Sequence, residues 1–87
     1  MSLEFPNASR SYDATRCAIH FWGYESAIEW SFFVTVAALR RLHPTMTQDE
    51  VGLLDAFDSN RDQIRAAAAK LYAHGRKGSY ELGAEDI

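Results

Sequence analysis

The sequence contains one cysteine, two prolines and no long apolar run. A single cysteine cannot form an internal disulfide, and small secreted domains usually need several, so a disulfide-stabilised scaffold is excluded. The N-terminus lacks the basic stretch and apolar segment of a signal peptide. The longest charge-free apolar run, residues 30–39, is shorter than the about 20 residues of a membrane span. These absences predict a cytoplasmic protein that does not enter a membrane.

Basic residues are a minority. Nine Lys and Arg stand against twelve Asp and Glu, a formal net charge of −3, and residues 44–87 carry the whole acidic excess. Composition therefore gives no support to general attraction for nucleic acid or anionic membranes. A local nucleic-acid surface would have to use Arg40, Arg41, Arg61, Arg65, Arg76 and Lys77. The net charge disfavours that hypothesis.

The chain is rich in aromatic residues. Its 87 residues include five Phe, four Tyr and two Trp, enough for a core in one domain spanning residues 1–87. A chain of this length buries only about 60% of its unfolded surface, so its stability margin is thin. Thin stability together with large aromatics favours association with a second copy.

Two segments alternate between apolar and polar residues, which is typical of strands. Residues 16–22 and 27–35 predict a β-hairpin with its turn centred on Tyr24 and Glu25. The expected pairs are Phe21 with Ile28, Ile19 with Trp30 and Cys17 with Phe32. This register places the apolar residues of both strands on one face and makes Cys17 a core thiol.

Helical periodicity follows the hairpin. Thr35 can cap a short helix over residues 36–42, ending before Pro44. Thr47, with Glu50 three residues later, matches a capping box at the start of a helical pattern over residues 48–74.

The second helical pattern is long. Gly75 supplies its expected stop, and an unbroken helix would measure roughly 40 Å. It would exceed the width of a domain this size, so one end would project or meet a partner. A single helix is the favoured interpretation, and a break near Asp58-Ser59-Asn60 is the alternative.

Residues 79–84 alternate again and predict a strand that returns to the sheet, while residues 2–5 are a weaker candidate for an edge strand. The expected fold is α+β. It has a small antiparallel sheet, made of the hairpin, the C-terminal strand and a possible N-terminal edge strand, packed against one short and one long helix.

No motif in the sequence indicates catalysis, a cofactor or a metal site. Cys17 and His20 point to opposite faces of an alternating strand, so they cannot share an ion. His20 and Glu29 lie opposite each other in the expected register, on the face away from the core. A carboxylate beside an imidazole could form an acid–base pair, although an ordinary cross-strand ion pair is the plainer interpretation.

The same outer sheet face carries the candidate interaction residues, which are Arg16, His20, Trp22, Glu29 and Phe33. Two large aromatics on a face that should meet water indicate coverage by another segment, a small-ligand site or self-association. We expect a non-enzymatic interaction domain that dimerises through this face or through the projecting helix. A small regulatory binder of a metabolite or peptide is the alternative.

A family pattern is also visible. Its marks are Tyr12-Asp13, Ile19-His20-Phe21, the strand 28–34, Ala38-Leu39, Phe57, Arg61, Ile64, Ala68 and Tyr80-Glu81-Leu82. This pattern resembles a family of small bacterial proteins known as domain of unknown function fourteen eighty-eight. The resemblance implies a compact α+β fold in a stand-alone bacterial cytosolic protein. It brings no catalytic or binding residues, because none is established for the family.

Overall fold

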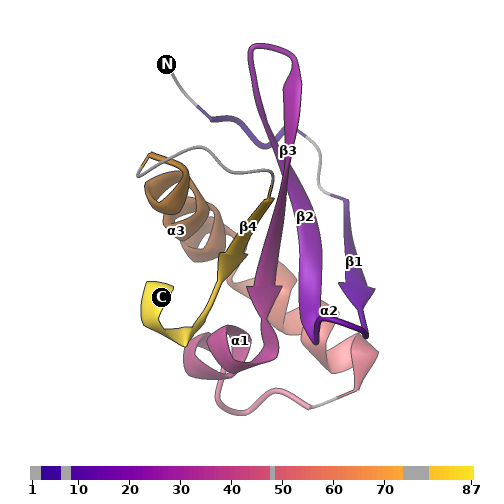
Figure 1. Ribbon diagram of the computed structural model, residues 1–87. Coiled ribbons are helices and arrows are strands. Elements are labelled where there is room, and N and C mark those ends of the chain that lie inside the picture. The colour runs from indigo at the N-terminus through magenta and orange to yellow at the C-terminus, as the bar shows by residue number, and fades with distance from the viewer. Residues whose placement is uncertain (1–2, 7–8, 48, 74–78) are drawn as a thin grey trace.

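The computed structural model has a four-stranded sheet with helices packed on one side (Figure 1). It describes residues 3–6, 9–47, 49–73 and 79–87. The elements are β1 (Arg10–Asp13), β2 (Ala18–Glu25), β3 (Ile28–Thr35), α1 (Val36–Leu42), α2 (Glu50–Ser59), α3 (Arg61–Ala73), β4 (Ser79–Leu82) and a 3-10 turn at Ala84–Asp86. No helix among these is long and apolar enough to cross a membrane.

The strand order is β1-β2-β3-β4. The first three strands are antiparallel to their neighbours, whereas β4 runs parallel to β3. The α+β class is as predicted, but the fully antiparallel sheet is wrong. Parallel neighbours need a long crossover, and the helices between β3 and β4 supply it. The expected edge strand at residues 2–5 is reduced to a single bridge between Glu4 and Tyr24, and β1 was not anticipated.

The hairpin register differs from the prediction by four residues. Phe21 pairs with Phe32 and Ile19 with Val34, because the turn lies at Ser26 and Ala27. These two residues have φ angles of 53° and 68°, the left-handed conformation that a two-residue hairpin turn requires. The sequence lacks the Asn-Gly pair that usually marks such a turn. An even shift keeps every side chain on its predicted face.

Cys17 is not a core residue. It is exposed, has a φ angle of 51° and lies in the turn between β1 and β2. Its Sγ donates to the carbonyl oxygen of Ala14 at 3.7 Å. The alternating pattern therefore predicted the strand about two residues too early, since β2 begins at Ala18.

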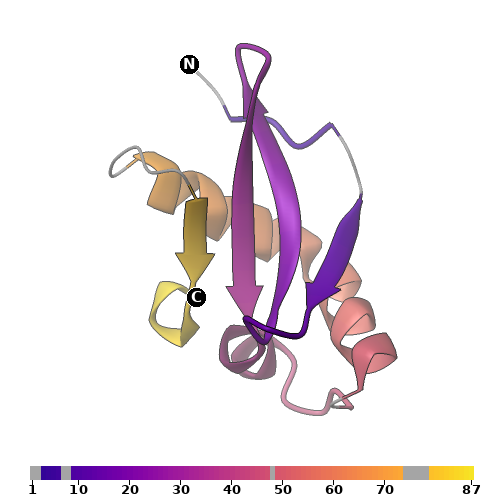
Figure 2. The ribbon, with the colours of Figure 1, turned by 45° about the vertical axis from the view of Figure 1, so that its right-hand side comes forward.

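The helical segment breaks at Asn60, so the single long helix is wrong and the alternative near Asp58-Ser59-Asn60 is confirmed. The Asn60 side-chain amide donates to the carbonyl oxygen of Ala56 at 2.9 Å, and its backbone N–H lies 3.2 Å from the carbonyl oxygens of Ala56 and Phe57. Such side-chain competition for helical carbonyls bends or ends helices. In Figure 2, α2 and α3 follow one another across one side of the sheet.

The helix caps agree in part. Thr35 caps α1 as predicted, accepting from the N–H of Ala38 at 3.1 Å. The cap of α2 is Asp49 rather than Thr47; its carboxylate accepts from the N–H of Gly52 at 2.9 Å. A carboxylate is favoured over a hydroxyl here because it also meets the positive end of the helix dipole. Gln48 and Gly75, the expected ends of the long helix, lie outside the described residues.

The core lies between the sheet and the helices. Its largest fully buried side chains are Tyr80, Phe32, Phe57, Ile19, Leu39, Ile64, Leu82 and Val34. The N-terminal segment joins this side, where the Phe5 ring lies 6.0 Å from Phe21 and 5.9 Å from Phe32. Gly23 makes room for it, since a Cβ there would stand 3.0 Å from both the Phe5 and Phe32 rings.

An ion-pair network connects β1 to the helix break. Arg10 donates two hydrogen bonds to the Asp58 carboxylate, at 3.0 and 2.8 Å, and Arg61 donates a third at 2.5 Å. The Arg10 hydrogen bond is the main cause that lowers the pKa of Asp58. A bidentate pair of this kind fixes an orientation, although solvent weakens it.

Asp58→Asn is expected to lower the free energy of unfolding by roughly 1 kcal/mol, because Asp58 is partly exposed and its ion pairs are screened. A depressed folded-state pKa gives stability that is present above the unfolded value of about 3.9 and is lost as the pH falls through the folded value. The deficit of the variant in urea unfolding should therefore shrink between pH 7 and pH 3. Exposed Asp55→Asn, on the same helix, is the control, and an equal loss there would contradict the role of the network.

Ala27→Gly is expected to raise the free energy of unfolding by roughly 1 kcal/mol, because it removes the left-handed strain of a residue with a Cβ. The matched change Ala66→Gly, at an exposed position inside α3, should lower it by about the same amount. Thermal or urea unfolding of both variants checks the opposite signs. Destabilisation by both changes would show that the turn is not the primed turn described.

Candidate functional site

The side of the sheet turned away from the helices, called the outer face here, is the candidate site. In Figure 1, α2 and α3 lie behind the sheet and leave this side open. Directly opposed residues form a row across all four strands, namely Ser11, His20, Phe33 and Glu81. No helix of the described residues lies over this row, so it faces a partner or solvent.

Four side chains of this face form a continuous stack. The Arg16 guanidinium carbon lies 4.1 Å from the centre of the Phe33 ring, and Phe33 stacks on His20 at 4.3 Å and 18°. His20 in turn lies 4.2 Å from Trp22. Two groups at such distances cannot share one face of a ring. The order is therefore Arg16, Phe33, His20, Trp22, and this set is called the stack below.

The stack explains how two aromatics are accommodated on this face. Phe33 is only 6% exposed, although no helix covers it, because Arg16 and His20 enclose its ring. Trp22 is half-buried at the other end. The cover foreseen from a terminal segment or from the short helix is thus supplied by neighbouring side chains. The outer face therefore exposes side chains that are already held in place by stacking, rather than mobile aromatic rings.

His20 is the electrostatically unusual member. Its Nε2 is shielded from solvent and has no hydrogen-bond partner among the described residues. Burial lowers the pKa of His20; the Asp13 and Glu29 carboxylates oppose this shift and the Arg16 charge adds to it. The imidazole is therefore held in its neutral form, which stacks on aromatics without needing an acceptor for a second N–H.

The predicted pairing of His20 with Glu29 is wrong, and with it both the cross-strand ion pair and the acid–base pair. The corrected register places His20 opposite Phe33 and Glu29 opposite Tyr24. The Tyr24 hydroxyl donates to Glu29 Oε2 at 2.6 Å, which anchors that carboxylate near the hairpin end of the face. All five predicted face residues do lie on the outer side, but Glu29 stands apart from the stack formed by the other four.

Sequence reasoning missed the group that positions Arg16. Asp13, at the end of β1, accepts from the backbone N–H groups of Thr15 and Arg16 at 3.0 and 3.2 Å. Its other oxygen lies 3.9 Å from Arg16 Nε. An Asp that bonds the backbone two residues on is the signature of an Asx turn. Recognising that turn before β2 would have moved Arg16 and Cys17 out of the strand.

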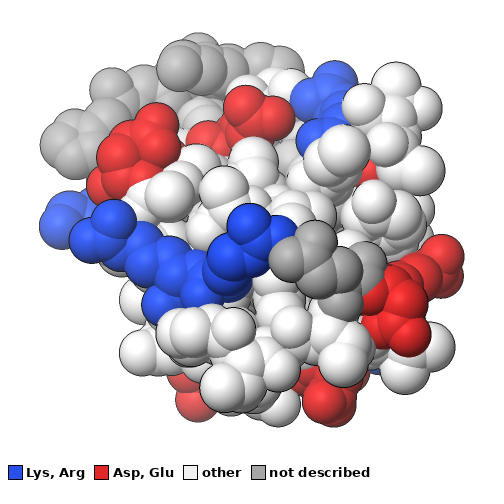
Figure 3. All heavy atoms as spheres, turned by 90° about the horizontal axis from the view of Figure 1, so that it is seen from below, with Lys and Arg blue, Asp and Glu red and all other residues white. Residues whose placement is uncertain are grey.

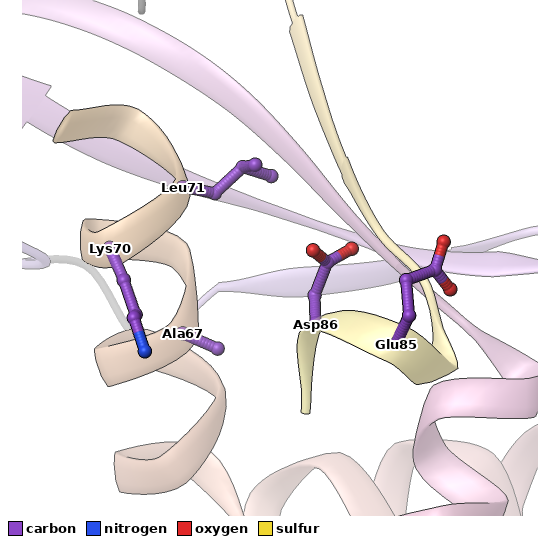
Figure 4. Close-up of a pocket in the computed structure, with 5 residues that line it drawn as sticks. All are labelled: Ala67, Lys70, Leu71, Glu85 and Asp86. Carbon is purple, nitrogen blue, oxygen red and sulfur yellow. The ribbon is translucent and has the colours of Figure 1, made fainter. Parts of the chain in front are cut away.

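A shallow groove lies elsewhere, between α3 and the C-terminal 3-10 turn (Figure 4). Its volume is about 160 Å³, and it is lined by Ala67, Lys70, Leu71, Glu85 and Asp86. Small-molecule sites usually occupy about 300 Å³ or more, so this groove offers little support for a metabolite site. Within the described ranges, no three His, Cys, Asp or Glu residues are grouped to hold a metal ion.

Basic side chains are divided among separate places. Arg40 and Arg41 are exposed in the last turn of α1. Figure 3 shows a group of Lys and Arg side chains on the underside of the molecule. On α3, Arg61 pairs with Asp58 and Arg65 lies 5.3 Å from the centre of the Phe5 ring. Arg76 and Lys77 lie outside the described residues. Of the four described arginines in the predicted nucleic-acid surface, Arg61 and Arg65 are thus committed to contacts within the fold.

Comparisons with known proteins agree with this architecture. The crystal structure of a protein of unknown function from Shewanella loihica PV-4 is 20% identical, with a TM-score of 0.82, over 93% of this chain and 91% of that one. At this identity the likeness establishes the fold alone. No curated protein matches the chain. A family model described as "Protein of unknown function (DUF1488)" matches residues 3–82, and the chain therefore belongs to that family, as its resemblance implied.

Proposed function

We propose that this protein is a non-enzymatic interaction domain that dimerises through its outer face. The observation that carries the proposal is an ordered stack of side chains on a sheet face that no described helix covers. The inner face of the same sheet carries the buried core residues of β2, β3 and β4. The outer face is thus the large surface of the sheet that is available to a partner.

The stack is suited to binding because it is ordered in advance. Immobilising a flexible side chain at an interface costs about 0.5–1.5 kcal/mol. The Arg16 and Trp22 side chains already rest against ring neighbours, so contact with a partner would order them little further. Arg and Trp are also the residue types enriched among those that dominate binding energy.

A second copy is the partner that the charges favour. Arg16 lies in the turn before β2, four residues before His20, and its guanidinium reaches back over Phe33. Glu29 lies near the hairpin end, paired with Tyr24, which is four residues after His20. A two-fold axis along the row of His20 and Phe33 brings Glu29 of each copy to the end of the face from which the Arg16 side chain of the other extends. Such reciprocal contacts are what a two-fold dimer requires.

The size of the face predicts a weak dimer. Two strands of eight residues and two of four cover roughly 400 Å² at standard strand spacing. A standard stable interface buries about 800 Å² per partner. Association should therefore depend on concentration. We also propose a cytosolic location, because the exposed Cys17 thiol persists most readily in a reducing compartment.

Charge reversal tests the orientation of the dimer. Arg16→Glu and Glu29→Arg should each weaken dimerisation about tenfold or more, because each places like charges together twice per dimer. The double variant restores both reciprocal contacts and should recover most of the affinity. Sedimentation equilibrium over a concentration series measures the dissociation constants. A double variant weaker than both single variants would refute this orientation.

Trp22→Ala tests the face itself. Removing the end of the stack should raise the dissociation constant at least about tenfold, while circular dichroism reports an unchanged fold. Val51→Ala is the matched control, because Val51 is 75% exposed on α2, on the other side of the sheet. A wild-type monomer at high micromolar concentration, measured by light scattering on a size-exclusion column, would overturn the proposed function.

A further inference from the structure

The middle of the outer face holds one titratable ring in an unusual setting. His20 lies between Phe33 and Trp22, and its Nε2 is shielded and unpartnered within the described part of the chain. A proton added at either ring nitrogen would leave both nitrogens as N–H donors. The stack offers aromatic faces there, and no oxygen lies within bonding distance of Nε2.

We propose that protonation of His20 releases the outer-face dimer, so that self-association of this protein depends on pH. The inference rests on the dimer proposed above and adds its regulation. Its basis is geometric: His20 lies at the centre of the row along which the two-fold axis runs. The two His20 rings of a dimer therefore approach each other more closely than any pair of charges at the ends of the face.

Two charges in one small interface account for the direction of the effect. Protonation of both rings places two imidazolium groups near the axis, where burial has removed most of their water. Each would also stand near the Arg16 guanidinium, which lies on the far face of Phe33. Like charges in a partly dry interface repel more strongly than they do in solvent. The neutral rings carry no such cost.

The surrounding charges moderate this effect and do not reverse its direction. Asp13 on β1 and Glu29 on β3 favour the protonated ring, whereas burial, the largest cause, and Arg16 disfavour it, and the pKa of His20 is lowered overall. Glu81 on β4 is exposed and lies one strand away, opposite Phe33. The dimer adds burial, so it binds protons less readily than the monomer. By linkage, its affinity is full above the monomer pKa of His20 and falls as the pH drops through that value.

Sedimentation equilibrium at pH 7.5 and pH 5.5 tests the inference. The wild-type dissociation constant should be higher at pH 5.5 and should rise by about tenfold or more once the pH lies below the lowered monomer pKa of His20, since each dimer must shed two protons to form. His20→Phe keeps a stacked ring without a titrating group, and its dissociation constant should be the same at both pH values. His43→Gln removes a different histidine and should behave as the wild type does.

Each result separates the two proposals. A wild-type dimer of equal affinity at both pH values, or a His20→Phe variant that still dissociates in acid, overturns the role of His20 and leaves the dimer intact. Absence of a dimer at pH 7.5 overturns the proposed function. If the His20→Phe variant does not fold, the inference can still be tested on the wild-type protein. In NMR titrations the His20 ring should protonate at lower pH in a concentrated sample than in a dilute one, and identical curves would refute the inference.

Discussion

The break at Asn60 is the constraint on which the rest of the structure depends. One straight helix from Glu50 to Ala73 would be roughly 36 Å long, which is the full length of the molecule, 36 Å in its longest dimension. By bonding its side chain to the Ala56 carbonyl, Asn60 ends α2 one residue before α3 begins. Phe57 and Ile64, on either side of the break, both become fully buried. Asp58 beside it then holds Arg10 and fixes β1 to the helices.

This arrangement gives the sheet two different faces. All three helices and the N-terminal segment pack on one side of the sheet. On the other side, the sheet's own side chains shield one another from solvent. The outer face achieves this through stacking: Phe33 becomes nearly as inaccessible as a core residue, although no helix or strand of the described residues lies over it. Ring stacking and a cation over a ring each contribute about 1 kcal/mol. The stack therefore contributes to the stability of the sheet while it stays accessible at its Trp22 end.

The sequence was sufficient for those features that depend on periodicity. Alternation identified the faces of β2 and β3, and a hydroxyl before an apolar run identified the Thr35 cap. The sequence was insufficient where a single residue adopts a backbone conformation that is unusual for its residue type. Ser26 and Ala27 adopt left-handed angles without being Asn or Gly, so the turn and the register were misplaced. The five residues of the candidate face share one side of the sheet, but alternation contains no information on register, and so it wrongly paired His20 with Glu29.

The sequence pattern could not predict the direction of β4 either, because parallel and antiparallel strands show the same alternation of apolar and polar residues.

The position of β4 has a consequence for how the chain folds. Tyr80 and Leu82 are buried against β3, yet they come nearly fifty residues after their strand neighbours. Pairing of such distant segments is slow because a long loop must close first. During synthesis, the edge of β3 that pairs with β4 therefore stays unpaired after the hairpin and the helices have been made. Only when residue 82 has been added can the sheet be completed, and the synthesis of β4 thus decides when the domain becomes native.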